Sequence, residues 1–467
     1  MRRFAALLAA AGLALLLAAP ANAEVKTETF KYGPVEVNGF EVKLNNDFAT
    51  PHPDVDGFIT AMNVDVVDAN GKPVPIQRIM LHHIVFGNLG QKFGDKRDAT
   101  CNAFTNFDSR TQLPALTERF YGAGEERARL QLPPGYGYQI KKGERWSLYY
   151  MLMNHKSKKD KVYIQYTVTY DTNPDLKPVT PYWLDVRNCW VDPVYNVPGG
   201  GKPGSTDRKA TNWTVPYSGR IVAAGGHVHG GGKDLELREP MCGNRLLYKS
   251  TPTWGLPSHP FYNVRPILHE PGPINMSGFN SAQGIPVAGG EKLKFISNYD
   301  EQYVHTRVMG ISLLYLAHDD SVTKPCGAMP TDIRTFGSPI PGRKETPRFT
   351  VPITAVGRDG VARSVSKAPG GTQTLRGDAR VNVKDFYFSR PNVIVPQGSK
   401  LTWKFFGSTL HNVTLANGPR GFASDNASQN EQYSYKFKVP GTYRLFCALH
   451  PVDMTETVTV LPKGKKK

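Results

Sequence analysis

Near its C-terminus the chain reads Phe446-Cys447-Ala448-Leu449-His450-Pro451-Val452-Asp453-Met454, and Leu410-His411-Asn412-Val413 precedes this stretch. One thiolate, two imidazoles and one thioether form the ligand set of a copper site that transfers electrons. Residues 441–446 predict a strand that ends at the cysteine, and residues 455–460 predict the strand that follows. A short loop between two strands would hold a metal in nearly fixed geometry. The predicted copper ligands are therefore His411, Cys447, His450 and Met454.

This last unit resembles the cupredoxins of the plastocyanin, pseudoazurin and amicyanin group. The resemblance covers residues 380–460 and rests on Val395-Pro396-Gln397-Gly398, the segment around His411, Pro440-Gly441-Thr442-Tyr443 and the Cys-x-x-His loop. It implies a Greek-key β-sandwich with one type 1 copper. The three residues between His450 and Met454 make a loop intermediate among those of the group. The alternative is a buried free thiol at Cys447, with Met454 as a core residue.

The chain as a whole has the composition of an all-β protein. The 467 residues include 45 glycines and 37 prolines, and long apolar helical stripes are absent. Short alternating segments recur between turn signals, as at Leu401, Trp403 and Phe405. We expect domains at 24–190, 191–320 and 376–463, a proline- and glycine-rich linker at 321–375 and a basic tail at 464–467.

The N-terminus reads as a cleaved secretory signal over residues 1–23. Arg2 and Arg3 precede an apolar run, and Ala21-Asn22-Ala23 is a small-residue cleavage site. The run is too short to span a bilayer comfortably, and no later stretch is long and apolar enough. We therefore expect export to the periplasm or cell exterior and no membrane span.

Charge and cysteines fit an exported protein. The net charge is +17 with scattered basic residues, and nothing resembles a nucleic-acid-binding module. This charge indicates a solvated basic surface or weak attraction to an anionic cell surface. Five cysteines leave one unpaired if the others form disulfides, and Cys447 is the candidate for the free thiol. The sequence does not choose among the three pairings of Cys101, Cys189, Cys242 and Cys326.

Two pairs of histidines lie far upstream of the cysteine. His227 and His229 are flanked by glycines, and residues two apart on a strand share a face, roughly 6–7 Å apart. They can therefore bind one metal ion. The adjacent His82 and His83 would point to opposite faces of a regular strand. Their joint ligation needs a bulge, a twist or a strand end.

With their flanking residues, the two pairs resemble the copper type II monooxygenases, which include peptidylglycine alpha-hydroxylating monooxygenase and dopamine beta-monooxygenase. The matching segments are Leu81–Gly87, Gly226–Gly230 and Val308–Tyr315, within residues 30–317. The resemblance implies two consecutive jelly-roll-like β-sandwiches that hold two type 2 coppers. His82, His83 and a third ligand would bind the copper that passes electrons. His227, His229 and Met309 would bind the copper that activates dioxygen and carry the catalysis.

Two features depart from this family, the third ligand of the first copper and the substrate-anchoring residues. The third ligand of the first copper should lie in residues 149–155, where His155 is the only histidine and Met153 is the alternative. Gly225 stands where the peptide-amidating members have an arginine for the substrate carboxylate, and Ile311 and Leu313 replace polar residues. The pocket should therefore be less polar and the substrate a small molecule other than a peptidylglycine. His52, His259, His269, His305 and His318 are isolated and read as structural or exposed.

The sequence thus predicts a secreted copper-dependent monooxygenase whose cupredoxin relays electrons from an external donor. The alternative is a non-enzymatic protein for copper storage, copper delivery or electron transfer. A hydrolytic zinc site at His227 and His229 ranks last, because no general base lies near them in sequence and Met309 would be an unusual zinc ligand.

Overall fold

The computed structural model describes residues 24–92, 94–101, 117–190, 193–337 and 342–464. The predicted signal segment lies outside these ranges, as does most of the basic tail. Strands make up nearly all the regular structure; the α-helix α1 (Pro260–Asn263) has only four residues. The predicted all-β class is confirmed. Among the helices of the described ranges, none has the length and apolar character that a membrane crossing needs.

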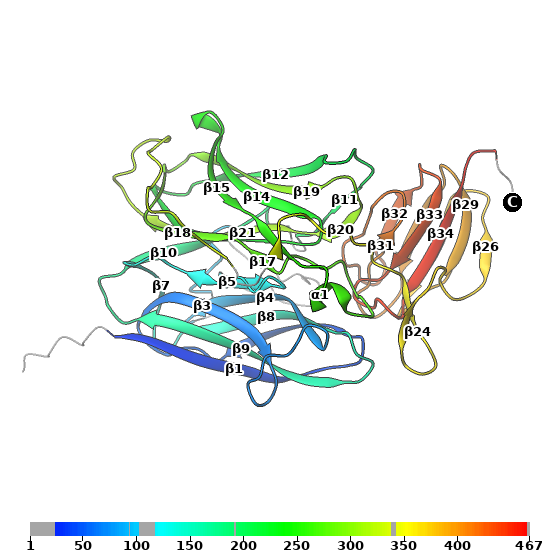
Figure 1. Cartoon of the computed structure of the whole chain (residues 1–467), viewed down its shortest axis with the longest axis horizontal. Helices are drawn as coiled ribbons and strands as arrows, with labels where there is room; N and C mark the ends of the chain where they lie inside the picture. Colours follow the sequence, from blue (N-terminus) through cyan, green and yellow to red (C-terminus); the bar gives the residue numbers. More distant parts are fainter. Residues whose placement is uncertain (1–23, 93, 102–116, 191–192, 338–341, 465–467) are drawn as a thin grey trace, which may run out of the picture.

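The first sandwich lies at the bottom of Figure 1, in blue and cyan. One of its sheets pairs β1 (Val25–Val37), β9 (Asp160–Asp171), β3 (Gly57–Val67) and β7 (Tyr136–Ile140), with β6 (Leu130–Gln131) beside β3. The facing sheet pairs β2 (Val42–Thr50), β8 (Arg145–Asn154), β4 (Ile79–Gly90) and β5 (Glu118–Gly124). Fully buried aromatic rings such as Phe86, Phe120 and Trp146 fill the space between the sheets.

The second sandwich continues the first through a shared sheet. β7 pairs in parallel with β10 (Lys177–Asp185), and β21 (Gly310–His318), β13 (Gly219–Val228), β18 (Gly278–Val287) and β22 (Arg334–Phe336) follow. The facing sheet pairs β12 (Thr206–Thr214), β19 (Lys292–Asp300), β14 (Gly232–Glu239) and β15 (Arg245–Ser250). β10, which we expected in the first unit, therefore belongs to the sheet of the second.

Smaller elements complete this half. β11 (Tyr195–Val197) pairs with β20 (His305–Val308), and β16 (Pro252–Gly255) pairs with β17 (Asn275–Met276) and β23 (Gly342–Arg343). A 3-10 turn spans Pro240–Cys242. The disulfides Cys101–Cys189 and Cys242–Cys326 settle the pairing that the sequence left open, and Cys447 is free and buried.

The C-terminal domain is a sandwich of two sheets, in orange and red in Figure 1. One sheet contains β26 (Thr372–Thr374), β29 (Asn392–Pro396), β34 (Thr455–Leu461), β33 (Gly441–Phe446) and β31 (Thr414–Asn417). The other contains β28 (Tyr387–Phe388), β27 (Ala379–Lys384), β30 (Lys400–Phe405) and β32 (Gln432–Lys436). Leu401, Trp403 and Phe405 are buried in its core, as their alternation along the sequence indicates.

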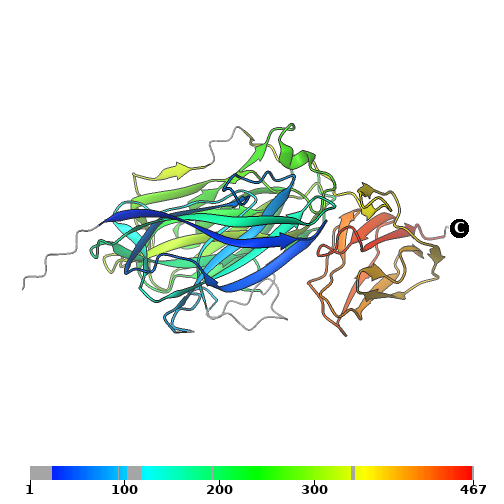
Figure 2. The same cartoon turned by 90° about the horizontal axis from the view of Figure 1, so that it is seen from below.

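The C-terminal domain packs directly against the upstream sandwiches (Figures 1 and 2). Val452, between two predicted copper ligands, joins an apolar cluster with Met80, Met153 and Trp254. The connecting segment 321–375 forms the hairpin β24 (Thr354–Val356) and β25 (Ala362–Ser364), and Thr354 donates to the carbonyl of Pro451 at 3.1 Å. Most described residues of the expected linker are exposed or half-buried, but Val351, Ile353 and Thr354 are buried, and this short stretch contacts the ligand loop.

Candidate metal centres

The C-terminal site gathers three of its four predicted ligands around one point. The Nδ1 atoms of His411 and His450 lie 3.2 Å apart, and Cys447 Sγ lies 3.7 Å from His450 Nδ1. The backbone N–H of Asn412 donates to this sulfur at 3.4 Å. The ligand atoms of the two histidines and the cysteine all lie within 4.8 Å of one another. Two imidazoles and a thiol in this arrangement fit a type 1 copper.

Backbone and side-chain contacts fix these ligands. Cys447 directly follows β33. Its N–H donates to the carbonyl of Met454 at 3.1 Å, and the N–H of His450 donates to the carbonyl of Cys447 at 3.1 Å. His411 Nε2 lies 3.0 Å from Asp385 Oδ1, which orients the ring from behind. Burial lowers the pKa of His450 to about 4, so this ring is neutral and able to ligate. Met454 is fully buried on the same loop.

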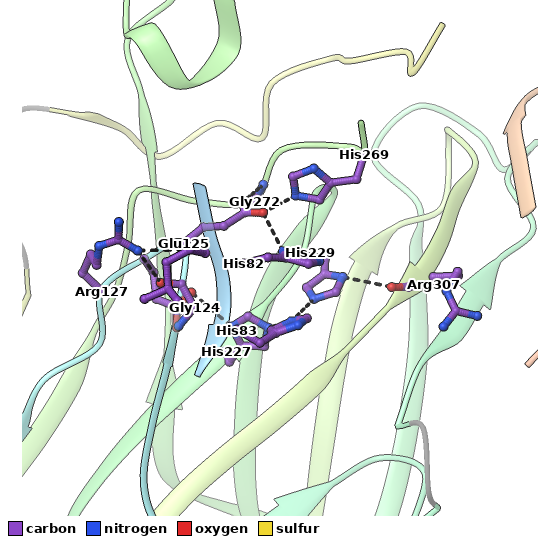
Figure 3. A network of polar contacts seen from close by, with 12 residues as sticks. His82, His83, Gly124, Glu125, Arg127, His227, His229, His269, Gly272 and Arg307 are labelled. Carbon is purple, nitrogen blue, oxygen red and sulfur yellow. Dashed lines mark hydrogen bonds and ion pairs between the residues drawn. The ribbon is translucent and has the colours of Figure 1, made fainter. Parts of the chain in front are cut away.

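The upstream histidines converge on a second site at the junction of the two sandwiches (Figure 3). His83 Nε2 lies 3.2 Å from His227 Nε2 and 3.0 Å from His229 Nε2. His83 comes from β4 and His227 from the end of β13, so the site forms only when both sandwiches are in place. His83 Nε2 thus has one nitrogen of His227 and one of His229 close by, and imidazole nitrogens are common ligands of transition metals.

Acceptors behind two of these rings decide which nitrogens face the site. His229 Nδ1 lies 2.9 Å from the carbonyl of Arg307, which can only accept a hydrogen bond. Burial lowers the pKa of His229 well below its usual value, so the ring is neutral with its proton on Nδ1. Its Nε2 lone pair therefore points into the site. His227 Nδ1 lies 3.0 Å from Glu126 Oε2, an arrangement that orients metal-binding histidines.

His82 joins the same cluster because β4 is irregular at this point. The register of β4 against β8 shifts between Leu81 and His83, as a β-bulge requires. The rings of His82 and His83 lie 4.0 Å apart, and ligand atoms of His82, His83 and His229 lie within 4.8 Å of one another. His82 Nδ1 lies 2.8 Å from Glu125 Oε1. The neighbouring glutamates 125 and 126 thus each orient one histidine of the cluster.

Sequence reasoning missed His269 as well as the two glutamates. His269 Nε2 contacts the same Glu125 oxygen as His82, and the N–H of Gly272 donates to the other oxygen at 2.7 Å. His82, Glu125 and His269 thus form a second group with metal-ligand spacing. For the glutamates, the available sequence signal was the adjacent pair Glu125 and Glu126 directly after Gly124. His269 carries no local signal, because it lies alone in a loop between β16 and β17.

The structure groups the upstream residues differently from the family-based expectation of two separate coppers. His155 Nδ1 lies 3.1 Å from the carbonyl of Pro266, and its buried Nε2 has no hydrogen-bond partner in the described part of the chain. Met309 is buried, and its carbonyl accepts a hydrogen bond from the hydroxyl of Tyr299. The same hydroxyl accepts a hydrogen bond from the backbone N–H of His229. His83 therefore lies with His227 and His229 in one cluster, whereas His155 lies outside the close group.

The comparisons with known proteins assign the C-terminal domain. Residues 376–461 match the model described as copper binding proteins of the plastocyanin/azurin family. The amicyanin-alpha of Methylorubrum extorquens is 32% identical over 101 residues, which is 21% of this chain and 80% of that protein. The C-terminal domain belongs to the plastocyanin/azurin family. Copper binding and copper-dependent electron transfer follow for this cupredoxin domain, as its ligands predict.

Solved cupredoxins are also similar to this domain. A purple cupredoxin from Nitrosopumilus maritimus is 24% identical, with a TM-score of 0.17. The match covers 18% of this chain and 100% of the purple cupredoxin chain. A reduced Cu(I) amicyanin variant is 27% identical and covers 18% of this chain and 83% of its own, also with a TM-score of 0.17. Upstream, residues 150–319 match the family described as Stress up-regulated Nod 19. The predicted monooxygenase resemblance finds no support in these matches.

The histidine cluster separates two cavities. The first, of about 60 Å³, is lined by His83 and His227 and lies between the two sandwiches. The second, of about 90 Å³, is lined by His82, His83, His229 and Met309 on one side. Phe446 and Ala448, which flank the cupredoxin cysteine, line its other side. One face of the cluster is therefore turned to the cupredoxin and the other to a separate pocket.

Proposed function

We propose that this chain is an exported copper-dependent monooxygenase, to whose upstream histidines the cupredoxin domain relays electrons. The observation that carries the proposal is the convergence of three imidazole nitrogens between an apolar pocket and the cupredoxin. His83, His227 and His229 would hold the catalytic copper. His82, with His269 and Glu125, offers a second copper position beside it.

The side chains around the cluster have separable roles. A copper bound there supplies one-electron redox chemistry and activation of dioxygen for hydroxylation of a substrate C–H bond. Glu126 and the carbonyl of Arg307 hold His227 and His229 in the tautomer that ligates through Nε2. Met309 lines the cavity on the cupredoxin side, where a thioether favours the reduced metal.

Arg307 supports the relay because it contacts both sites. Its carbonyl accepts from His229, and its guanidinium donates to the carbonyl of Ser424 in the cupredoxin at 2.9 Å. Ser424 N–H donates to Val413 at 2.9 Å, next to Asn412, whose N–H reaches the Cys447 sulfur. A continuous chain of covalent and hydrogen bonds thus joins the two ligand sets. An external donor would reduce the cupredoxin first.

Two disulfides are compatible with an extracytoplasmic location, where we propose that the protein works after export. Its net charge of +17 supports weak attraction to an anionic cell surface. The substrate would be a small molecule.

A second candidate function is copper storage or delivery without catalysis. The observation that favours it is the number of ligands in the cluster, since His82, Glu125 and His269 adjoin the three converging histidines. A store needs many ligands and no substrate, whereas a monooxygenase needs an open coordination position.

Metal analysis and dioxygen uptake distinguish the two functions. The copper-loaded full-length protein is expected to contain type 2 copper beside the blue copper and to consume dioxygen with ascorbate. His83→Ala and His229→Ala should lose the type 2 spin-resonance signal and the uptake, while His318→Ala, which removes an exposed imidazole, should retain both. Copper at the cluster without ascorbate-dependent uptake would favour storage. Unchanged metal content in both cluster variants would refute both functions.

A further inference from the structure

The first cavity has the shape of a binding pocket for a small organic molecule. It lies between β4 and β5 of the first sandwich and β13 and β21 of the second, with His83 and His227 in its lining. The exposed side chains of Arg129 and Gln131 also line it, which places its mouth at the surface. Its volume of about 60 Å³ has room for a few water molecules, or for part of a small organic molecule that also fills the mouth.

The walls of this pocket are apolar between the histidines and the mouth. Val85, Trp183 and Ile311 are buried side chains of the lining. Two tyrosines also line it, but their hydroxyls are already satisfied: Tyr121 donates to Ala128 at 2.6 Å and Tyr315 donates to Phe120 at 2.8 Å. They therefore offer aromatic surface to a ligand.

The buried charge in the lining is also already engaged. Glu126 accepts from the N–H of Gly124 at 2.9 Å and holds His227 Nδ1 at 3.0 Å. Arg129 is the other charged residue of the lining, but it lies at the exposed mouth. A charged ligand that entered the apolar part would therefore lose its hydration without gaining an opposite charge there, which is unfavourable. An uncharged hydrocarbon surface loses nothing comparable and gains from burial.

Gly225 keeps the pocket open. It lies two residues before His227 on β13, so a side chain at 225 would project from the same face as His227. A Cβ built there meets no atom within 4 Å, and Gly225 itself lines the pocket. At the neighbouring Gly226 a Cβ would instead approach Ser250 Oγ at 2.6 Å, inside the second sandwich. The empty space at 225 is therefore part of the pocket.

We propose that this pocket binds an uncharged, largely hydrocarbon molecule no larger than one aromatic ring, with one end against His83 and His227. This inference rests on the proposed function, whose substrate class it names. The pocket places such a ligand on the side of the cluster away from the cupredoxin, so the substrate and the electrons reach the histidines from different sides.

Direct binding of toluene, with benzoate as its charged counterpart, tests the inference in the copper-loaded full-length protein. Calorimetry and saturation-transfer NMR should detect toluene and not benzoate. Gly225→Phe should weaken toluene binding about tenfold or more by filling the pocket, and Gly225→Val should weaken it less. Gly371→Phe is the matched control, because a Cβ at Gly371 also meets open space but outside the pocket.

Copper content and the type 2 signal, measured on the same samples, separate the two proposals. Two outcomes would overturn the pocket assignment alone. In the first, copper is retained and Gly225→Phe binds toluene as well as the native chain does. In the second, benzoate and toluene bind equally well. If the native protein binds toluene, Gly225→Phe abolishes that binding, and neither protein holds upstream copper, the proposed function is overturned and the pocket assignment stands. Melting curves identify a variant that fails to fold, in which case Gly225→Val supplies the test.

Discussion

The guanidinium of Arg307 donates to the backbone carbonyl of Ser424 at 2.9 Å, across the boundary between the upstream sandwiches and the cupredoxin. The same residue has a φ of 53°, in the left-handed region, and its carbonyl faces His229. A non-glycine residue in this conformation costs about 1 kcal/mol or more and persists where the surrounding structure requires it. Arg307 is thus held at the point where the cupredoxin ligands and the upstream histidine cluster approach each other.

Arg307→Ala should slow electron transfer from the cupredoxin to the upstream site by about 10- to 100-fold, because the side-chain half of the bonded route is lost. Flash reduction followed at the blue absorption band measures the rate. Arg420→Ala is the control, since Arg420 donates to Gly199 across the same boundary but touches neither ligand set. Equal slowing in both variants would indicate loosened docking and no specific role for Arg307.

Glu126→Gln should weaken copper binding at the cluster by about 10- to 100-fold, since the amide can still accept from His227 but carries no charge. Competition with a copper chelator measures this affinity. Glu270→Gln alters a similar carboxylate–histidine pair, at His305, and should leave the affinity unchanged. If both variants bind copper as tightly as the native chain, Glu126 does not support a metal.

Cys447→Ser should abolish the blue absorption band and remove one copper per chain, because the thiolate supplies the charge-transfer partner. The type 2 signal of the upstream cluster should persist, since its ligands lie on other elements. Elemental analysis and spin resonance on one sample check both statements. A simultaneous loss of both copper classes would mean that the two sites do not load independently.

Glu291→Gln should make stability less sensitive to a rise in pH from 5 to 8. Burial, together with the neighbouring carboxylate of Glu239, raises the pKa of Glu291 from 4.5 to about 7. A raised acid pKa stabilises the fold fully below pH 4.5, and this contribution is lost as pH rises through about 7. The native chain should therefore lose a few degrees of melting temperature relative to the variant between pH 5 and pH 8. If the melting temperatures of the native chain and the variant change equally with pH, Glu291 does not have this role.

The cupredoxin site was predictable from sequence because its information is local. Cys447, His450 and Met454 share one short loop, and His411 lies in the adjacent part of the same small domain. The possibility of a bulge at His82 and His83 was also foreseeable, since adjacent residues share a site only when a strand is irregular.

The composition of the upstream cluster was not predictable from sequence. His83 meets His227 and His229 only because two sandwiches pack together, and no local pattern reports that contact. His269 reaches the cluster from a loop and reads as an isolated residue in the sequence. The docking of the cupredoxin was hidden for a similar reason: the connecting segment has the composition of a linker, but Val351 and Ile353 are buried within it.

The parallel pairing of β7 with β10 means that neither sandwich is built to exist alone. Expressing residues 24–176 without the remainder would leave β7 as a bare edge and uncover the aliphatic and aromatic walls that now face the second half. Exposed edges and apolar faces of this kind promote aggregation. The two sandwiches should therefore be produced and purified as one unit.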